Sequence, residues 1–357
     1  LIETGKNQEL NELKTKAAKV KVSGFIPAND EGPDSVLFLI EGESCKPYAA
    51  TLKNQGISTD KIGIMPMRGV PANLYGASST EALNNMIFAS ILKVARLDPT
   101  ARYTSPEQIR TLKYGSFIFL GDPDLDGFHI ISLMIANFCN FWPELFTERR
   151  VGILRTPVVR IYSRHHKILA RYYTDIEYET AVLNGTAPEG NIKRNKGLGS
   201  VEAGTLDKPG SELLDDYTNA SVMWLDMTIE GRGLLHVFFA ARSAKDRKEN
   251  IVALAPKCLI PDTSYVIDNE CALPSITTAP VMRKKISSYI EKELIQYSLG
   301  SLIRAIPLGH DGLKDVQRKI LAWWCEKHNF GKRNERRKVE QMIGFISEMQ
   351  QYHHGAT

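Results

Sequence analysis

Two short apolar runs that each end in acidic residues constrain this chain more than any other feature. The first run, Val36–Ile40, is followed at once by Glu41, and the second, Phe117–Leu120, is followed by Gly121 and Asp122. Neither run alternates apolar with polar residues, which is typical of strands buried on both faces of a parallel sheet. Because parallel strands end at one edge of the sheet, where open α/β folds hold their sites, we expect these acids to meet there.

The second run opens into the sequence Asp-Pro-Asp-Leu-Asp-Gly, in which Asp122, Asp124 and Asp126 lie two positions apart. In locally extended backbone these carboxylates project toward one side of the chain, and Gly127 permits a sharp turn after them. Carboxylates crowded in this way repel one another unless a hard cation lies among them, and such oxygen ligands suit Mg²⁺. The sequence therefore predicts a metal site with Glu41 as a further acid beside it.

Two other structures share parts of this pattern. An EF-hand loop would need a Glu at its twelfth position, where this chain has Leu133, and a helix rather than a strand before it. An acidic surface turn whose Asp caps the next helix would need no metal, since Asp and Gly are common at helix starts. Glu41, at the end of the other strand, favours the metal site over both.

The motif Glu41-Gly-Glu-Ser44 and the aspartate motif together resemble the Toprim domain of topoisomerases, bacterial primases and some nucleases. Further family-like segments are Met65-Pro-Met-Arg-Gly69, Lys196-Gly-Leu-Gly-Ser200, Asp311-Gly-Leu-Lys-Asp-Val-Gln-Arg-Lys319 and Tyr352-His-His-Gly355. In this order they resemble the DNA cleavage core of eukaryotic-type type IIA DNA topoisomerases, over nearly the whole chain. Val70 stands where the family has Lys, and Asp315 where Pro is usual, so the resemblance is to a divergent member.

The resemblance implies a role for each acid in a reversible, Mg²⁺-assisted transesterification. Glu41 would ligate the first ion and act as general acid/base, Asp122 and Asp124 would complete its shell, and Asp126 would share a second ion with Asp124. Mn²⁺ or Ca²⁺ could replace Mg²⁺ in binding. The resemblance also implies DNA contacts for Arg68, Lys196, Lys314, Arg318, Lys319, His353 and His354. Of these, His354 would also assist proton transfer.

The same resemblance implies a larger parent protein, a homodimer that acts on double-stranded DNA. The family's nucleophilic tyrosine, preceded by arginine, follows the Tyr-His-His-Gly motif by several dozen residues, so we expect it beyond Thr357 and expect this chain alone to be inactive. The pairs Arg102-Tyr103 and Arg171-Tyr172 mimic that dipeptide but lie upstream of the winged-helix segment, and we interpret them as unrelated. ATP would bind only in an ATPase region that precedes this chain.

Two other functions are kept as alternatives. Another Toprim enzyme, a primase or nuclease, would attack phosphodiesters with water or a nucleotide hydroxyl and would need no tyrosine. It would leave the segment Lys196-Gly-Leu-Gly199 and the last hundred or so residues unexplained. A DNA-binding scaffold without catalysis would use the acids only to balance charge.

Composition narrows the class of protein. The 357 residues carry a net charge of +4 with a basic run at 332–338, which is typical of a solvated face or of phosphate neutralisation. Five cysteines without a C-x-x-C pair indicate a reduced, intracellular protein without zinc, and both a nuclear and a viral or cytoplasmic replication compartment stay open. The longest apolar stretch, Phe128–Trp142, is shorter than the ~20 residues of a membrane span, so we expect no membrane association.

The chain order predicts an α/β Toprim domain with a Rossmann-like parallel sheet, a mixed α+β extension and the opening helices of a winged-helix domain. The expected limits are 1–30 for a linker, 31–150 for the Toprim domain, 151–255 for the extension with the Lys-Gly-Leu-Gly loop, and 256–357 for the truncated winged-helix part. Expected strands are 36–40, 62–66 and 117–120, and expected helices are 46–54, 79–96, 128–141, 281–301 and 316–327.

Overall fold

The computed structural model describes residues 10–15, 17, 19–54, 59–195, 197–198, 222–262, 265–268, 281–328, 336 and 338–349. The chain divides into two compact units, Leu1–Tyr297 and Ser298–Thr357, and each is described by itself. The finer domain limits expected at residues 30, 150 and 255 stay predictions.

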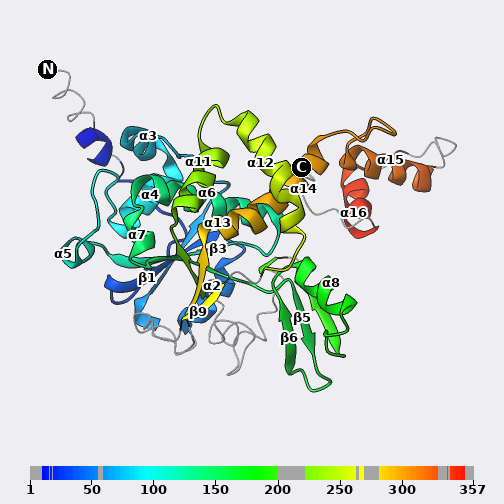
Figure 1. The fold of residues 1–357 in the computed structure, drawn as a ribbon, viewed down its shortest axis with the longest axis horizontal. Helices are drawn as coiled ribbons and strands as arrows, with labels where there is room; N and C mark the ends of the chain where they lie inside the picture. Colours follow the sequence, from blue (N-terminus) through cyan, green and yellow to red (C-terminus); the bar gives the residue numbers. More distant parts are fainter. Residues whose placement is uncertain are drawn as a thin grey trace. The chain divides into compact units, whose positions relative to one another are not determined.

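The first unit is built on a mixed sheet of seven strands (Figure 1). In spatial order the strands are β2 (Ile62–Met67), β1 (Gly32–Glu41), β3 (Tyr114–Leu120), β4 (Val151–Leu154), β8 (Val222–Asp226), β10 (Val281–Lys285) and β9 (Val266–Asp268). The first four strands run parallel, β8 and β10 run parallel to each other, and the β4–β8 and β10–β9 pairs are antiparallel. The predicted α/β class is confirmed.

Alternate residues of β1 and β3 enter two separate hydrophobic clusters. On one face Leu37, Leu39 and Phe119 belong to the larger cluster, and on the other Phe38 and Ile118 belong to the smaller one. Both faces of these strands are thus buried, which explains why the runs show no polar alternation. The site at the strand ends therefore stands on a rigid, doubly covered sheet.

Helices cover the sheet and connect its strands. The larger helices of the first unit are α2 (Lys46–Asn54), α3 (Ser79–Asn84), α4 (Met86–Ala95), α6 (Leu125–Phe141), α11 (Ile229–Phe239) and α12 (Ala244–Cys258), and shorter pieces are η1 (Thr59–Lys61), α5 (Pro106–Ile109) and α7 (Glu144–Thr147). The predicted helix 79–96 is two helices, because the Asn85 carboxamide accepts a hydrogen bond from the Phe88 N–H and starts α4 anew.

The prediction of one helix over 281–301 was wrong for its first five residues. Residues Val281–Lys285 form β10, which pairs in parallel with β8, and the helical path begins only at Ile286. It then runs through α13 (Ile286–Tyr289), the π-helical turn η3 (Ile290–Leu294) and α14 (Ile295–Ala305). The cause is tertiary, because residues 281–285 pair with the edge of β8. Nothing in the local pattern of polar and apolar residues indicates that pairing.

A second, three-stranded antiparallel sheet lies apart from the large one and is accompanied by α8 (Asp175–Leu183), as Figure 1 shows. Its order is β6 (Ile168–Tyr172), β5 (Val159–Tyr162) and β7 (Asn191–Arg194). The second compact unit contains α15 (Asp315–His328) and α16 (Val339–Met349), and α15 confirms the predicted helix 316–327. Within the described ranges, no helix is long and apolar enough to cross a membrane.

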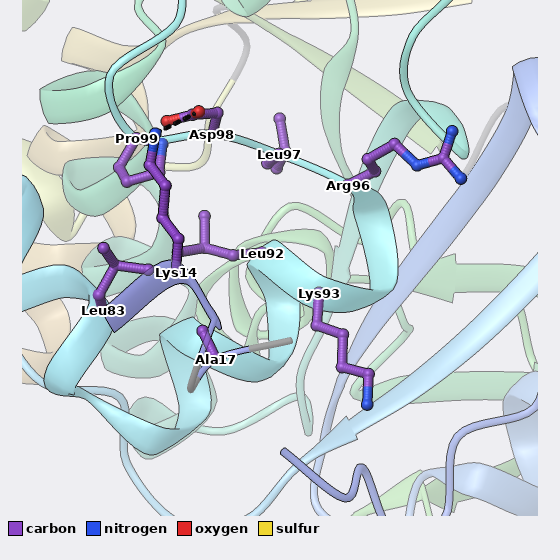
Figure 2. A pocket seen from close by; sticks show the side chains of 9 residues that line it. All are labelled: Lys14, Ala17, Leu83, Leu92, Lys93, Arg96, Leu97, Asp98 and Pro99. Atoms are coloured by element: carbon purple, nitrogen blue, oxygen red, sulfur yellow. Dashed lines mark hydrogen bonds and ion pairs between the residues drawn. The ribbon is translucent and has the colours of Figure 1, made fainter. Parts of the chain in front are cut away.

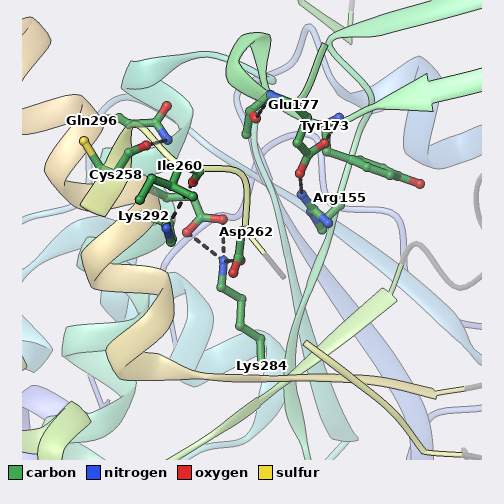
Figure 3. Close-up of polar contacts among 11 residues, drawn as sticks. Arg155, Tyr173, Glu177, Cys258, Ile260, Asp262, Lys284, Lys292 and Gln296 are labelled. Atoms are coloured by element: carbon green, nitrogen blue, oxygen red, sulfur yellow. Dashed lines mark hydrogen bonds and ion pairs between the residues drawn. The ribbon is translucent and has the colours of Figure 1, made fainter. Parts of the chain in front are cut away.

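A buried ionic network fastens β10 to the helix that follows it (Figure 3). The Lys284 ammonium, which is 0% exposed, lies 2.6 Å and 2.8 Å from the two carboxylate oxygens of Glu293 and 2.5 Å from Asp262 Oδ2. Close by, Arg155 donates to Glu177 Oε1 at 3.0 Å and stacks on the Tyr173 ring. Lys284 thus joins β10 to η3 and to Asp262 through buried charges, and the separate Arg155–Glu177 pair joins the end of β4 to α8.

Candidate functional site at the carboxyl edge of the sheet

Glu41 and Asp122 meet at the carboxyl edge of neighbouring parallel strands. β1 and β3 are in register, with Ile40 opposite Leu120, so both strands end at the same level of the sheet. The Glu41 Oε2 atom accepts a hydrogen bond of 2.9 Å from the Asp122 backbone N–H. The parallel pairing therefore brings together two acids that are 81 residues apart in the sequence.

The aspartate turn after β3 also starts helix α6. Asp124 is the N-cap residue, and its Oδ1 accepts a hydrogen bond of 2.8 Å from the Gly127 N–H, while Asp126 lies in the first helical turn. A side chain at position 127 would collide with the Asp122 carbonyl oxygen, so only glycine fits there. The capping role considered for this turn is therefore present, and it fixes where the three aspartates lie.

Two contacts that the sequence did not reveal hold the Asp122 carboxylate. The Leu198 N–H donates to Asp122 Oδ1 at 2.8 Å, and the buried Cys45 thiol lies 3.5 Å from the same oxygen. Gly197 approaches closely as well, since a Cβ there would lie 3.3 Å from Asp122 Oδ2. The Gly-Leu part of the Lys-Gly-Leu-Gly loop thus touches the acids, whereas Lys196 lies outside the described residues.

The electrostatics of this edge raise the pKa of Glu41 to about 7. Burial is the largest cause, because removing the carboxylate from water disfavours its charged form. The hydrogen bond from the Asp122 N–H lowers the pKa, and the charges of the three aspartates raise it. Glu41 is thus a carboxyl group that can hold or release a proton near neutral pH.

The four acids offer the right chemistry for a hard divalent cation, because all their ligand atoms are carboxylate oxygens. Their mutual repulsion, which contributes to the raised pKa of Glu41, is the kind that such a cation relieves. In the part of the chain that the structure describes, however, no three His, Cys, Asp or Glu side chains are grouped so that they could hold a metal ion. Asp122 and Asp124 accept from backbone N–H groups instead.

The raised pKa predicts how Glu41 affects stability in metal-free buffer. The unfolded state has an ordinary carboxyl pKa near 4.5, so between about pH 4.5 and 7 the folded chain holds a proton that the unfolded chain has lost. Glu41 therefore destabilises the fold increasingly as pH rises through that window. We expect a Glu41→Gln variant to melt at the wild-type temperature at pH 4 and above it at pH 8, in differential scanning calorimetry with EDTA. Equal melting temperatures at pH 8 would contradict the raised pKa.

Comparisons with known proteins relate this chain to the DNA topoisomerases 2. DNA topoisomerase 2-alpha of Rattus norvegicus is 29% identical over 340 residues, and DNA topoisomerase 2 of Plasmodium falciparum (isolate K1 / Thailand) is 30% identical over 368. These alignments cover 92% and 99% of this chain but only 21% and 24% of the relatives' lengths. The chain is a homologue of the eukaryotic type II DNA topoisomerases.

A solved structure places the homology in one region of the relatives. The crystal structure of the Plasmodium falciparum topoisomerase II DNA-binding, cleavage and re-ligation domain superposes with a TM-score of 0.71 at 26% identity, covering 94% of this chain and 43% of that one. The family model for the A-type subunit of DNA gyrase/topoisomerase IV matches residues 304–357. This topoisomerase homologue thus resembles part of that domain, and its residues 304–357 match the gyrase/topoisomerase IV family.

The basic residues that we expect to contact DNA lie in both compact units. In the first, Arg68 is 65% exposed and donates to Ser23 Oγ at 2.9 Å and to Glu43 Oε1 at 3.3 Å. In the second, Arg318 is paired with Asp311 through bonds of 2.8 Å and 3.0 Å. That pairing lowers the pKa of Asp311 to about 2.

The other residues expected to contact DNA lie on or next to α15, or outside the described residues. Lys319 lies 3.4 Å from Asp315, and the exposed Lys314 precedes the first turn of α15. His353 and His354 lie outside the described residues. Of the two Arg-Tyr pairs, Tyr103 is buried with its hydroxyl accepting from the Asp98 N–H, and Tyr172 packs on Tyr178.

A cavity of about 300 Å³ between helical residues 10–15 and α4 is a separate feature (Figure 2). Its floor is apolar, and its Lys14 ammonium is paired with Asp98 at 2.7 Å. Lys93, also at its edge, donates to the Val20 carbonyl oxygen at 2.6 Å. None of the four acids lines it, so it is no part of the candidate site.

Proposed function

We propose that this chain supplies part of the DNA cleavage and religation core of an ATP-dependent type IIA DNA topoisomerase. The Glu41–Asp122 hydrogen bond at the carboxyl edge carries the proposal, in a chain similar to a DNA-binding, cleavage and re-ligation domain. The parent protein would break both strands of one duplex transiently and pass another through the gap. It would act as a homodimer on double-stranded DNA.

In this proposal Glu41 moves the proton of the reaction. Cleavage by transesterification leaves a 3′ oxygen that must take up a proton, and religation returns that proton. A carboxyl group with a pKa of about 7 is suited to both directions, because neither form is strongly favoured at neutral pH. Leu198 and Cys45 keep the Asp122 carboxylate in place beside it.

Glu41, Asp122, Asp124 and Asp126 would hold Mg²⁺, which supplies stabilisation of the charge that develops on the phosphoryl oxygens. The remaining candidates would position the DNA without reading its sequence, since they are suited to phosphate contacts. These are Arg68, Lys196, Lys314, Arg318, Lys319 and His353. His354 would assist proton transfer from the tyrosine, which is expected after Thr357. ATP would serve only the preceding region of the parent protein.

A covalent adduct tests this proposal directly. We expect the full-length protein with supercoiled DNA and Mg²⁺ to yield, after denaturation, DNA linked through its 5′ end to a tyrosine, and we expect EDTA to abolish the adduct. Metal-dependent nicking without any adduct would instead support a Toprim nuclease or primase. Unchanged relaxation by an Asp124→Ala variant of the full-length protein would show that the acids take no part in catalysis, and would support a non-catalytic, scaffold role for this chain.

A further inference from the structure

The small antiparallel sheet carries its charges unevenly. On the α8 side, acids neutralise the arginines: Glu177 pairs with Arg155, and Asp175 pairs with Arg194 at 2.5 Å. At the opposite end, the β5–β6 hairpin closes through the sequence Arg164-His-His-Lys167, and all four side chains are exposed. Among the described residues, neither Arg164 nor Lys167 has an ion pair or a side-chain hydrogen bond.

The backbone of this tip is held in a defined shape. The Ser163 hydroxyl accepts hydrogen bonds from the N–H groups of His165 and Lys167, at 3.3 Å and 3.1 Å. The Ser163 N–H donates to the Lys167 carbonyl at 2.8 Å, and His166 adopts a left-handed conformation with φ of 58°. A solvated charge run needs no such fixation, whereas a fixed tip presents its cations at constant positions and loses less entropy on binding.

The small sheet also connects the tip to the acid edge, that is, the carboxyl edge of the large sheet where Glu41 and Asp122 meet. β7 pairs with β5, and its end at Arg194 is followed by Asn195, whose carboxamide donates to the Pro157 carbonyl oxygen. The chain then reaches Leu198, whose N–H holds Asp122. Lys193, on β7, lies opposite Arg160 and adds a further cation to this sheet. The small sheet that carries the basic tip is therefore continuous in sequence with the loop that touches the proposed reaction site.

We propose that the hairpin tip Arg164–Lys167 is a contact surface for the backbone phosphates of duplex DNA, outside the acid edge. A two-stranded β-ribbon fits the width of a DNA groove, and cations without acidic partners are free to neutralise phosphates. This inference rests on the proposed function, because duplex DNA is the partner that the proposed function implies. In Figure 1 the β5–β6 hairpin extends away from the large sheet, which leaves its tip open to a long ligand.

Salt-dependent binding tests the surface. The 357-residue chain and an Arg164→Ala/Lys167→Ala variant are titrated into a fluorescein-labelled duplex of random sequence, by anisotropy between about 50 and 200 mM KCl. Each lost phosphate contact reduces the slope of log K against log salt by about 0.9, so we expect the slope to fall by about 1 to 2. A Lys19→Ala/Lys21→Ala variant, which removes the same charge from exposed positions elsewhere, should keep the wild-type slope.

The outcomes separate this inference from the proposed function. If wild type binds the duplex and the hairpin variant keeps its slope, the tip is no contact surface while the proposed function stands. An equal decrease of the salt slope in the hairpin and control variants would also overturn the inference, because the lower net charge alone would then explain both decreases. If wild type fails to bind duplex at all, the proposed function itself loses its support. Circular dichroism of each variant checks that the exposed substitutions leave the fold intact.

Discussion

Replacing Glu41 by Gln in the full-length protein should reduce the rate of DNA relaxation by about 10²- to 10⁴-fold, the range that a positioned acid/base contributes. Glutamine keeps the size and the hydrogen bond to the Asp122 N–H but cannot take up or release a proton. Its carboxamide is also a weaker ligand for a hard cation than a carboxylate. Relaxation of supercoiled plasmid, followed over time at saturating Mg²⁺, measures the loss.

The matched control is Asp34→Asn, the same acid-to-amide change at the opposite end of β1. Asp34 is exposed and lies seven positions before Glu41 on one strand, so this variant should relax DNA within a few-fold of wild type. Because Glu41→Gln is expected to raise the melting temperature at pH 8, a loss of activity would not reflect unfolding. Wild-type rates for Glu41→Gln, or equal losses in both variants, would contradict the role of Glu41.

The meeting of Glu41 with Asp122 could be predicted because it follows from strand direction alone. Two unbroken apolar runs indicate parallel strands, and parallel strands end at one edge. The anchors of Asp122 could not be predicted in this way. Cys45 carries no periodic signal, and the Leu198 contact is a backbone N–H from a loop 76 residues away, which any residue type could provide.

Strand β10 shows the same limit for the fold. Its sequence, Val-Met-Arg-Lys-Lys, has no alternation of apolar and polar residues and precedes a clear helical pattern. Only the parallel partner β8 and the carboxylates of Glu293 and Asp262 make a buried lysine acceptable there. The Glu293 partner lies nine residues later, on a helical turn whose position depends on the sheet. Such a pairing depends on tertiary structure, so local propensity does not reveal it.

Lys284→Met should reduce the free energy of unfolding of the first unit by about 3 to 5 kcal/mol, as is typical when one partner of a buried ion pair is removed. The methionine keeps the length of the side chain but leaves the carboxylates of Glu293 and Asp262 buried without their shared ammonium. Burial already raises the pKa of Glu293, and Lys284 is the strongest influence that lowers it. The change should therefore appear as a lower urea midpoint by circular dichroism.

The pH dependence and a neighbouring lysine make this prediction specific. Without Lys284 the pKa of Glu293 rises further, so protonation relieves the defect at low pH, and the loss should be larger at pH 8 than at pH 5. Lys285→Met, the next position on β10, is exposed and should change stability by less than about 0.5 kcal/mol. Adding Glu293→Gln to Lys284→Met should recover part of the loss, because it removes one unpaired charge. A pH-independent loss would instead indicate that packing, and not the buried charges, holds β10 to the helix.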